Sequence, residues 1–155
     1  MPALNNIKRN IAEYISGYVD GEGCFSISFS KRKKMLVGWE TKPSFAVGQN
    51  YDRAEVIKLI QKYFGCGNIR RDYSDKTLKY EVRSMADLIG KIIPHFRRFP
   101  LLSAKRKDFE LFSRICAMMK KQKHLTRSGL KTIANLAYQM NSSGRRRYKK
   151  EELFR

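Results

Sequence analysis

The spacing of hydrophobic positions near the N-terminus predicts an amphipathic helix followed by a strand. The first apolar stripe recurs at i, i+4, i+7 and i+8 and consists of Ile11, Ile15, Tyr18 and Val19. This stripe predicts a helix from about Ile7 to Asp20, after a loose lead-in. Beyond Gly23 the spacing changes to two, because Phe25, Ile27 and Phe29 alternate with serines. That alternation predicts a half-buried strand whose outer face is a row of hydroxyl groups.

A basic loop and a second strand come next. Residues 31–34 are all lysine or arginine, which indicates a phosphate-contacting loop or, alternatively, a solvated hairpin tip. Alternating positions in Leu36–Gln49 predict a strand with Pro43 at a bend or an edge. The two strands together form a ribbon that is apolar on one face and small or polar on the other. Two-stranded ribbons of this kind fit the major groove of DNA.

The middle of the chain predicts a helix and another pair of strands. Asp52 is expected as the N-cap of this helix, with Glu55 three residues later, and Gly65 ends it. Residues 68–73 and 77–83 alternate again, with a turn at Asp75-Lys76 between them. The predicted sheet therefore has four strands, and its polar face carries long side chains that can reach base edges.

Further helices complete the predicted α+β fold, whose element order is αββαββα with additional C-terminal helices. A short helix over Met85–Ile93 is expected to end at Pro94, and Ser103 is expected to cap a long helix to about Lys121. Thr126 is expected to cap the last helix. We predict one domain over residues 1–140. Residues 141–155 form a basic tail that we expect to become ordered only on a polyanion.

Composition indicates a nucleic acid as the partner. The chain has 155 residues, 42% of them hydrophobic, which suits a single domain with its own core. Thirty-three Lys and Arg residues face 14 Asp and Glu residues, for a net charge of +19. A membrane is a poorer match, because no long apolar run and no signal-like N-terminus is present. Three cysteines without metal-site spacing indicate reduced thiols and an intracellular protein.

The end of the first helix carries two acids at the electrostatically unfavourable terminus. Asp20 and Glu22 lie where the helix dipole is negative, and a bound cation would reverse that cost. Gly17 and Gly21 lie four residues apart, so that another backbone can approach closely. This combination suggests a close-packed helix pair that presents carboxylates to a divalent metal. The alternative is a helix that ends in glycine caps with surface acids.

The same stretch also carries a family resemblance. Residues 15–23, Ile-Ser-Gly-Tyr-Val-Asp-Gly-Glu-Gly, resemble the signature of the LAGLIDADG homing endonucleases. Ser16 in place of Ala and Tyr18 in place of Leu are mild departures, and Glu22 keeps the carboxylate of the second Asp. The predicted element order is also that of the LAGLIDADG core, with its sheet as a DNA-binding saddle. The resemblance therefore extends over most of the chain.

The resemblance implies magnesium-dependent hydrolysis of DNA. Glu22 would hold Mg²⁺ together with the carbonyl of Gly21; Mn²⁺ or Ca²⁺ can substitute in the site, Ca²⁺ without turnover. Gln49 matches the residue that orients the active-site water, and Arg53 matches a basic residue near the scissile phosphate. Lys105 matches the active-site lysine, although Lys107, two residues away, leaves the choice between these lysines open.

The resemblance also implies a homodimer on a long, pseudo-palindromic target that is cut to leave short 3′ overhangs. Two copies would pack through Gly17 and Gly21, with Asp20 at the interface. Base choice would fall to the outward side chains of the sheet. The residues expected at the DNA are Ser26, Ser28, Ser30, Arg32, Lys34, Glu40, Ala46, Gly48, Arg70, Asp72, Lys79, Glu81, Arg145, Arg146 and Arg147.

Two other classes of function suit the charge and the sheet. One is an intron-RNA maturase and the other a non-cleaving DNA-binding protein on the same fold; a ribosomal-type RNA-binding protein explains the charge but not the helix-end acids. The joint presence of Glu22, Gln49 and Lys105 favours the nuclease, since a pure binder has no need of that set. We expect an intron-encoded protein of a chloroplast, a mitochondrion or a microbe, with double-stranded DNA and its host intron RNA as candidate partners.

Overall fold

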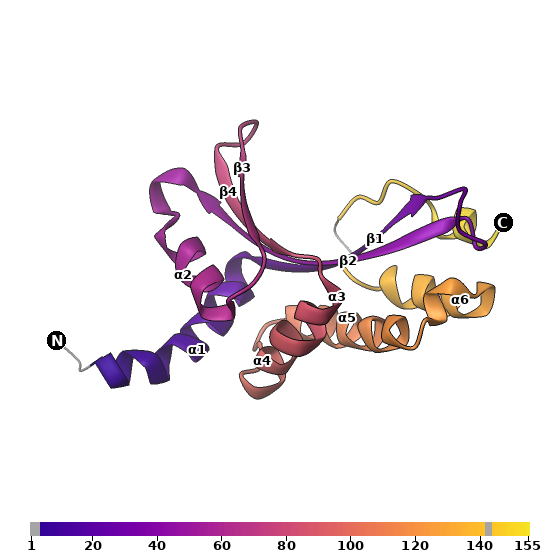
Figure 1. Ribbon diagram of the computed structural model, residues 1–155. Coiled ribbons are helices and arrows are strands. Elements are labelled where there is room, and N and C mark those ends of the chain that lie inside the picture. Colours follow the sequence, from indigo (N-terminus) through magenta and orange to yellow (C-terminus); the bar gives the residue numbers. More distant parts are fainter. Residues whose placement is uncertain (1–3, 142–143) are drawn as a thin grey trace. The chain divides into compact units, whose positions relative to one another are not determined.

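The computed structural model describes residues 4–141 and 144–155, with side chains from residue 11 onward. Figure 1 shows an α+β fold, as predicted, in which helices and strands follow in the expected order. The first part of the chain comprises α1 (Leu4–Glu22), β1 (Gly23–Lys31), β2 (Trp39–Asn50), the 3₁₀ turn η1 (Tyr51–Arg53), α2 (Glu55–Phe64), β3 (Asn68–Asp72) and β4 (Thr77–Val82). The remainder comprises α3 (Met85–Asp87), the π-helical turn η2 (Leu88–Ile92), α4 (Ile93–Arg98), α5 (Lys105–Lys120), the 3₁₀ turn η3 (Lys123–Leu125), α6 (Arg127–Ala137) and the 3₁₀ turn η4 (Lys150–Phe154).

The four strands form one sheet in the order β1-β2-β4-β3. Strand β4 pairs antiparallel with both β2 and β3. Its register places Tyr80 opposite Val47 and Ile69, so that apolar side chains share one face of the sheet. The alternation seen in the sequence therefore sets which face is buried.

The chain divides into two compact units, which we call unit 1 (Met1–Cys24 and Phe45–Arg106) and unit 2 (Phe25–Ser44 and Lys107–Arg155). In unit 1, the rings of Phe45, Phe64, Tyr80 and Phe96 cluster with centroids 5.5–6.5 Å apart, which places α2 and α4 on the apolar face of the strands. In unit 2, the Phe25 ring lies 5.3 Å from those of Phe109 and Phe112 of α5. Helices thus cover one face of the strands in each unit and leave the other face polar.

Two predicted helix starts are wrong. The first helix begins at Leu4, within the segment that we expected to be a loose lead-in; residues 1–3 of that lead-in lie outside the described residues. Asp52 is not an N-cap, because the chain first makes the turn η1 and α2 begins only at Glu55, after Ala54. Asp52 instead lies inside that turn, where its carboxylate is 3.8 Å from the Arg53 guanidinium.

The helix at Met85 does not end at Pro94, as the sequence predicted. It continues through the π-helical turn η2 into α4, which ends at Arg98, and Pro94 occupies the first turn of α4. A proline lacks an N–H and its ring crowds the carbonyl four residues earlier. The wider turn that immediately precedes Pro94 changes the local hydrogen bonding, so the helical path is maintained.

Two predicted caps agree with the structure. Ser103 Oγ accepts a hydrogen bond from the Lys105 N–H at the start of α5, over 3.2 Å. Thr126 Oγ1 accepts one from the Gly129 N–H in the first turn of α6, over 3.1 Å. Each serine or threonine side chain satisfies an amide that has no partner within its helix.

Candidate active site and nucleic-acid interface

The last turn of α1 is tied to the loop that precedes α5 through Asp20. One carboxylate oxygen of Asp20 accepts a hydrogen bond from the Leu102 N–H over 2.8 Å. The Ser103 N–H lies 3.2 Å from both carboxylate oxygens, and the Ser103 hydroxyl donates to one of them over 2.5 Å. Burial alone would raise the pKa of Asp20, but these hydrogen bonds and the charge of Lys105 outweigh it, so the pKa lies below its ordinary value. This acid is therefore ionised and already fully engaged within its own chain.

Lys105 complements the same helix end. Its ammonium nitrogen donates to the carbonyls of Val19 and Asp20, over 2.9 and 3.0 Å. These carbonyls have no amide partner within α1, and a cation at a helix C-terminus is favourable to the helix dipole. Two of the three ammonium protons are thereby used, and the third is available for an anion. The unfavourable position of Asp20, noted from the sequence, is thus offset by protein groups without a metal.

Glu22, two residues further on, is in a different situation. Its carboxylate is exposed and, among the described residues, has no hydrogen bond or ion pair. No group of three or more His, Cys, Asp or Glu side chains able to hold a metal occurs in the described part of the chain. A hard cation that keeps several waters, and takes only one or two carboxylates, is nevertheless compatible with a single glutamate beside the backbone of the exposed Gly21.

Gln49, at the end of β2, is oriented by α1. Its side-chain nitrogen donates to the Tyr18 hydroxyl over 3.0 Å, and its side-chain oxygen accepts from the Asn50 N–H over 2.9 Å. Tyr18 lies four residues before Glu22, on the same side of the helix. The structure thus joins two further predicted site residues, Gln49 and Lys105, to the last turn of α1.

Arg53 is held more loosely. It lies in η1, four residues after Gln49, and its side chain is 71% exposed. The turn itself is fastened by Tyr51, whose N–H donates to the Lys76 carbonyl over 3.2 Å. The Arg71 guanidinium stacks on the Tyr51 ring, 3.8 Å from its centroid. Arg71 was not among the predicted site residues, because nothing in the sequence pairs it with Tyr51.

The surface of α1 at Gly17 and Gly21 is exposed. Gly17 and Gly21 are exposed, and a Cβ added at either would meet nothing within 4 Å. A groove of about 290 Å³ runs beside Gly17, between α1 and the loop at Phe99-Pro100. Leu102, which lines this groove, is 91% exposed. This surface is available to another backbone.

A buried histidine that the sequence pattern did not single out joins α1 to α2 through Ser16 and Tyr63. Ser16 Oγ donates to the Phe99 carbonyl over 2.7 Å and therefore accepts from His95 Nε2–H, at 3.1 Å. His95 Nδ1 is then the acceptor for the Tyr63 hydroxyl, at 3.0 Å. Burial lowers the pKa of His95 to about 4, so the ring is neutral at pH 7. The apolar pattern that continues past Pro94 was the available signal for this residue.

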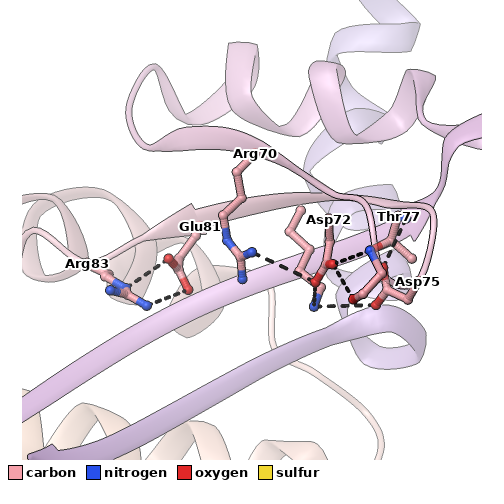
Figure 2. A network of polar contacts seen from close by, with 8 residues as sticks. Arg70, Asp72, Asp75, Thr77, Glu81 and Arg83 are labelled. Atoms are coloured by element: carbon pink, nitrogen blue, oxygen red, sulfur yellow. Dashed lines mark hydrogen bonds and ion pairs between the residues drawn. The ribbon is translucent and has the colours of Figure 1, made fainter.

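Figure 2 shows a charged network on the polar face of β3 and β4. Asp72 accepts from the Ser74 N–H and hydroxyl on one oxygen, while the other lies 3.4 Å from Lys79 Nζ and 4.0 Å from the Arg70 guanidinium. These hydrogen bonds from Ser74, aided by Lys79, hold the pKa of Asp72 below its ordinary value. Asp72 thus orients the two cations, rather than offering free oxygens to a ligand. Glu81 is paired similarly with Arg83, at 2.9 Å.

The polar face of β1 and β2 is built from hydroxyl groups and only one ion pair. Arg32 Nε lies 2.8 Å from a Glu40 carboxylate oxygen, and the Ser30 hydroxyl donates to the same oxygen over 3.4 Å. Ser28 donates to the Lys42 carbonyl over 3.4 Å. The other residues predicted there are Ser26, Ala46 and Gly48, which are partly exposed, and Lys34, which is exposed. Their predicted role in DNA contact stays a prediction.

The C-terminal segment is not the flexible tail that we expected, as far as it is described; Ser142 and Ser143 lie outside the described residues. The Asn141 side chain donates to the Phe25 carbonyl over 2.8 Å, and Arg146 donates to the carbonyls of Ile27 and Ala137. These groups cover the free edge of β1, which is the outer strand of the sheet. Arg146 is half-buried and bonded within the chain, whereas Arg145 and Arg147 are exposed, and the predicted contact of all three with DNA stays a prediction.

A family model, curated relatives and solved structures all relate the chain to the LAGLIDADG endonucleases. The LAGLIDADG endonuclease family model matches residues 15–116. A probable intron-encoded endonuclease 3 of Neurospora crassa is 33% identical over 127 residues, which are 81% of this chain and 24% of that protein. The crystal structure of the homing endonuclease I-TnaI has a TM-score of 0.81 and 32% identity, with 92% of each chain covered.

A second solved structure is that of I-SmaMI bound to an uncleaved DNA target in the presence of calcium ions. It has a TM-score of 0.80 and 30% identity, with 83% of this chain and 44% of that chain covered. The chain spans about a quarter of the length of the first curated relatives that it matches. Among the described residues, no helix combines the length and apolar character required to cross a bilayer.

Proposed function

Because the chain belongs to the LAGLIDADG endonuclease family, we propose that it is a site-specific DNA endonuclease that hydrolyses both strands of a long, pseudo-palindromic target and leaves short 3′ overhangs. The observation that carries this proposal is the difference between the two acids at the end of α1, Asp20 and Glu22. Asp20 and Lys105 are used within the chain, whereas Glu22 is exposed at the end of a fixed helix and has no polar partner among the residues that the structure describes. A DNA-binding protein without activity has no use for that arrangement.

A divalent metal suits this helix end. Glu22 and the carbonyl of Gly21 would hold Mg²⁺, with the remaining positions filled by water and by phosphate oxygens of the DNA. When bound, the metal would activate a water molecule and stabilise the departing 3′ oxygen. Two copies of the chain supply one Glu22 for each DNA strand.

The other side chains position groups and offset charge. The third proton of Lys105 would be directed at the scissile phosphate, where a fixed cation stabilises the additional negative charge of the transition state. Gln49, held by Tyr18, would orient the attacking water through its remaining amide proton and lone pair. Arg53 is exposed and able to reach a phosphate beside the cleaved bond. Neither histidine lies at these positions, so we assign no side chain as the general base.

The polar faces of the strands would contact the duplex. A homodimer through the open strip at Gly17 and Gly21 would place two such faces on one DNA molecule. The groove beside Gly17 and the exposed Leu102 supply apolar surface for that contact. Among the relatives, names that refer to introns suggest an intron-encoded protein, and we propose a mitochondrial or other organellar host.

The experiment that tests the proposal is incubation of the full chain with a library of randomised DNA duplexes, followed by sequencing of the broken ends. With Mg²⁺ we expect breaks on both strands at related sequences with 3′ overhangs, and with Ca²⁺ or EDTA we expect binding without breaks. Selective retention of duplexes without breaks in Mg²⁺ or Mn²⁺ would instead support the non-cleaving DNA binder. A parallel selection from randomised RNA that retains RNA, with no duplex retained or cut in the first selection, would support the maturase.

A further inference from the structure

A small cleft in unit 2 lies between α6, the turn η4 and the tip of the β1–β2 hairpin. Its volume is about 210 Å³. Its apolar lining includes Val37, Leu153 and the ring of Phe154, and its rim carries Arg127, Lys131 and Arg155. No part of the nuclease proposal uses these residues. The cleft thus combines an aromatic surface with three cations.

The ring of Phe154 in this cleft is partly exposed to solvent. Leu153 is 4% exposed and is the residue that anchors η4, whereas Phe154 is 40% exposed. The Lys131 ammonium lies 5.5 Å from the centroid of the Phe154 ring. An exposed ring beside a cation is the arrangement on which proteins stack the bases of single-stranded nucleic acid.

Among the described residues that line the cleft, none is Asp or Glu. The sequence contains no Asp or Glu between Glu110 and Glu151. The two glutamates of η4 lie elsewhere: Glu152 accepts a hydrogen bond from the Lys149 N–H, and Glu151 lines a separate hollow. Three exposed lysines lead along the chain to the cleft, namely Lys120, Lys121 and Lys123. This run of cations can follow the phosphates that flank a bound nucleotide.

The outer side of α6 is also distinct from the polar face of the strands. The apolar face of β1 packs on the helices of unit 2, as the contacts of Phe25 and Phe29 with α5 and with Tyr138 demonstrate. Within α6, Leu130 and Ile133 are buried, while Arg127 and Lys131 are exposed on the flank that, together with Leu130, lines the cleft. The described residues that line the cleft include none of the strand residues predicted to contact a duplex.

We propose that this cleft binds an unpaired nucleotide of a single-stranded nucleic acid, with the base on Phe154 and the adjoining phosphates on Arg127 and Lys131. The volume is below the roughly 300 Å³ from which small-molecule and cofactor pockets usually start, so one nucleotide is a better match than a dinucleotide cofactor. RNA and DNA share this chemistry, because every base has a stacking face. This site is independent of cleavage and does not require the nuclease proposal to hold.

The test measures the binding of fluorescent ten-nucleotide oligo(rA) and oligo(dA) to the full chain, with excess unlabelled DNA duplex present to occupy the strand face. Phe154→Leu keeps an apolar side chain but removes the aromatic face, and we expect about tenfold weaker binding. Tyr14→Leu is the matched control, since Tyr14 is also an exposed aromatic residue but lies on α1 in unit 1, and we expect no change. Lys131→Gln should reduce the salt dependence by about 0.7 in the log–log slope, whereas Lys62→Gln on α2 should not.

Photo-crosslinking of the wild-type chain tests the same site without any substitution, so the result does not depend on whether a variant folds correctly. Oligonucleotides that carry 4-thiouridine or 4-thiothymidine should label the tryptic peptide 151–155. Crosslinks from RNA alone would identify RNA as the ligand, and equal crosslinks from both would identify any single strand. Labelling confined to the strands, together with unchanged affinity in Phe154→Leu, would overturn the proposal. Loss of crosslinks in the presence of excess duplex would also overturn it, because the single strand would then share the duplex surface.

Discussion

The two compact units differ in how they hold their polar side chains. In unit 1, Asp20, Lys105 and Gln49 are fixed by hydrogen bonds to neighbouring elements, and even on the strand face the cations are oriented by Asp72. In unit 2, most basic side chains are exposed, and the strand face consists largely of hydroxyl groups. Catalysis requires groups fixed before the reaction, whereas affinity for a polyanion accumulates from many modest contacts. Substitutions of the fixed residues at the end of α1 and of Lys105 should therefore reduce the rate on bound DNA, and substitutions of the exposed cations of unit 2 should reduce affinity.

Replacement of Lys105 should have a large effect on the rate of DNA cleavage. Lys105→Ala should lower the single-turnover cleavage rate by about 10²- to 10³-fold, because a fixed positive group at the transition state is lost. Lys107→Ala is the matched control, since Lys107 is exposed and two residues away. The rate should be measured with saturating target DNA and Mg²⁺. A larger loss in Lys107→Ala than in Lys105→Ala would assign the active-site lysine to position 107.

Next in size is the pH dependence of stability that His95 causes. Its pKa is 6.5 ordinarily and about 4 in the folded chain, so between these values the unfolded chain binds more protons. The free energy of unfolding should therefore fall as the pH is lowered from 6.5 to 4, by about 3 kcal/mol in total from this group.

Urea unfolding at pH 7 and pH 4.5 checks the prediction for His95. His95→Gln should lose less stability on acidification than the wild type does, and the difference isolates His95 from the carboxylates that titrate in the same range. His124→Gln should retain most of the wild-type dependence, because His124 is only partly buried. An identical pH dependence in the wild type and His95→Gln would contradict the buried, neutral state of His95.

Arg146 is the exception within unit 2, because its guanidinium is bonded to backbone carbonyls. Arg146→Met should lower the free energy of unfolding by about 1–3 kcal/mol, since the carbonyls of Ile27 and Ala137 lose a charged donor. Arg145→Ala should leave stability unchanged and weaken DNA binding uniformly across sequences. Denaturant unfolding and a salt titration of binding separate these outcomes. Equal stability of the two variants would place Arg146 among the phosphate contacts instead.

The smallest expected effect concerns base preference. Asp72→Asn should reduce the discrimination between bases near Arg70 and Lys79 by about tenfold, because the carboxylate that orients both cations is neutralised. Asp52→Asn changes the charge equally but lies in η1, so its base preference should match that of the wild type. Selection of bound duplexes from a randomised library gives the preference without the need for cleavage. If base preference changed equally in both variants, Asp72 would act through its negative charge alone and not by orienting Arg70 and Lys79.

The fold followed from the sequence because its strands and helices have clear apolar spacing. The alternation of Phe25, Ile27 and Phe29 gave the correct buried face of β1, and Ser103 and Thr126 acted through local amides. Local rules failed where the backbone departs from a regular helix. The turn η1 displaced the expected cap at Asp52, and the π-helical turn η2 carried the helix past Pro94.

The candidate site was predictable in its residue types but not in its contacts. The sequence could place an acid at the end of α1, but the partners of Asp20 lie more than 80 positions away, in the loop at Leu102 and Ser103. The contacts of His95 and Arg146 were not foreseen for the same reason, since they are made with hydroxyls and carbonyls that are distant in sequence. Long-range polar contacts have no periodicity that reveals them.

The role of Glu22 is tested most directly by Glu22→Gln, which keeps the shape of the side chain and removes its charge. Binding of the selected target and single-turnover cleavage in Mg²⁺ should be measured on the same preparation. We expect target affinity within about threefold of the wild type, because Glu22 is exposed and lacks partners among the described residues, and a loss of cleavage greater than about 10³-fold. Cleavage by Glu22→Gln at the wild-type rate would contradict the account.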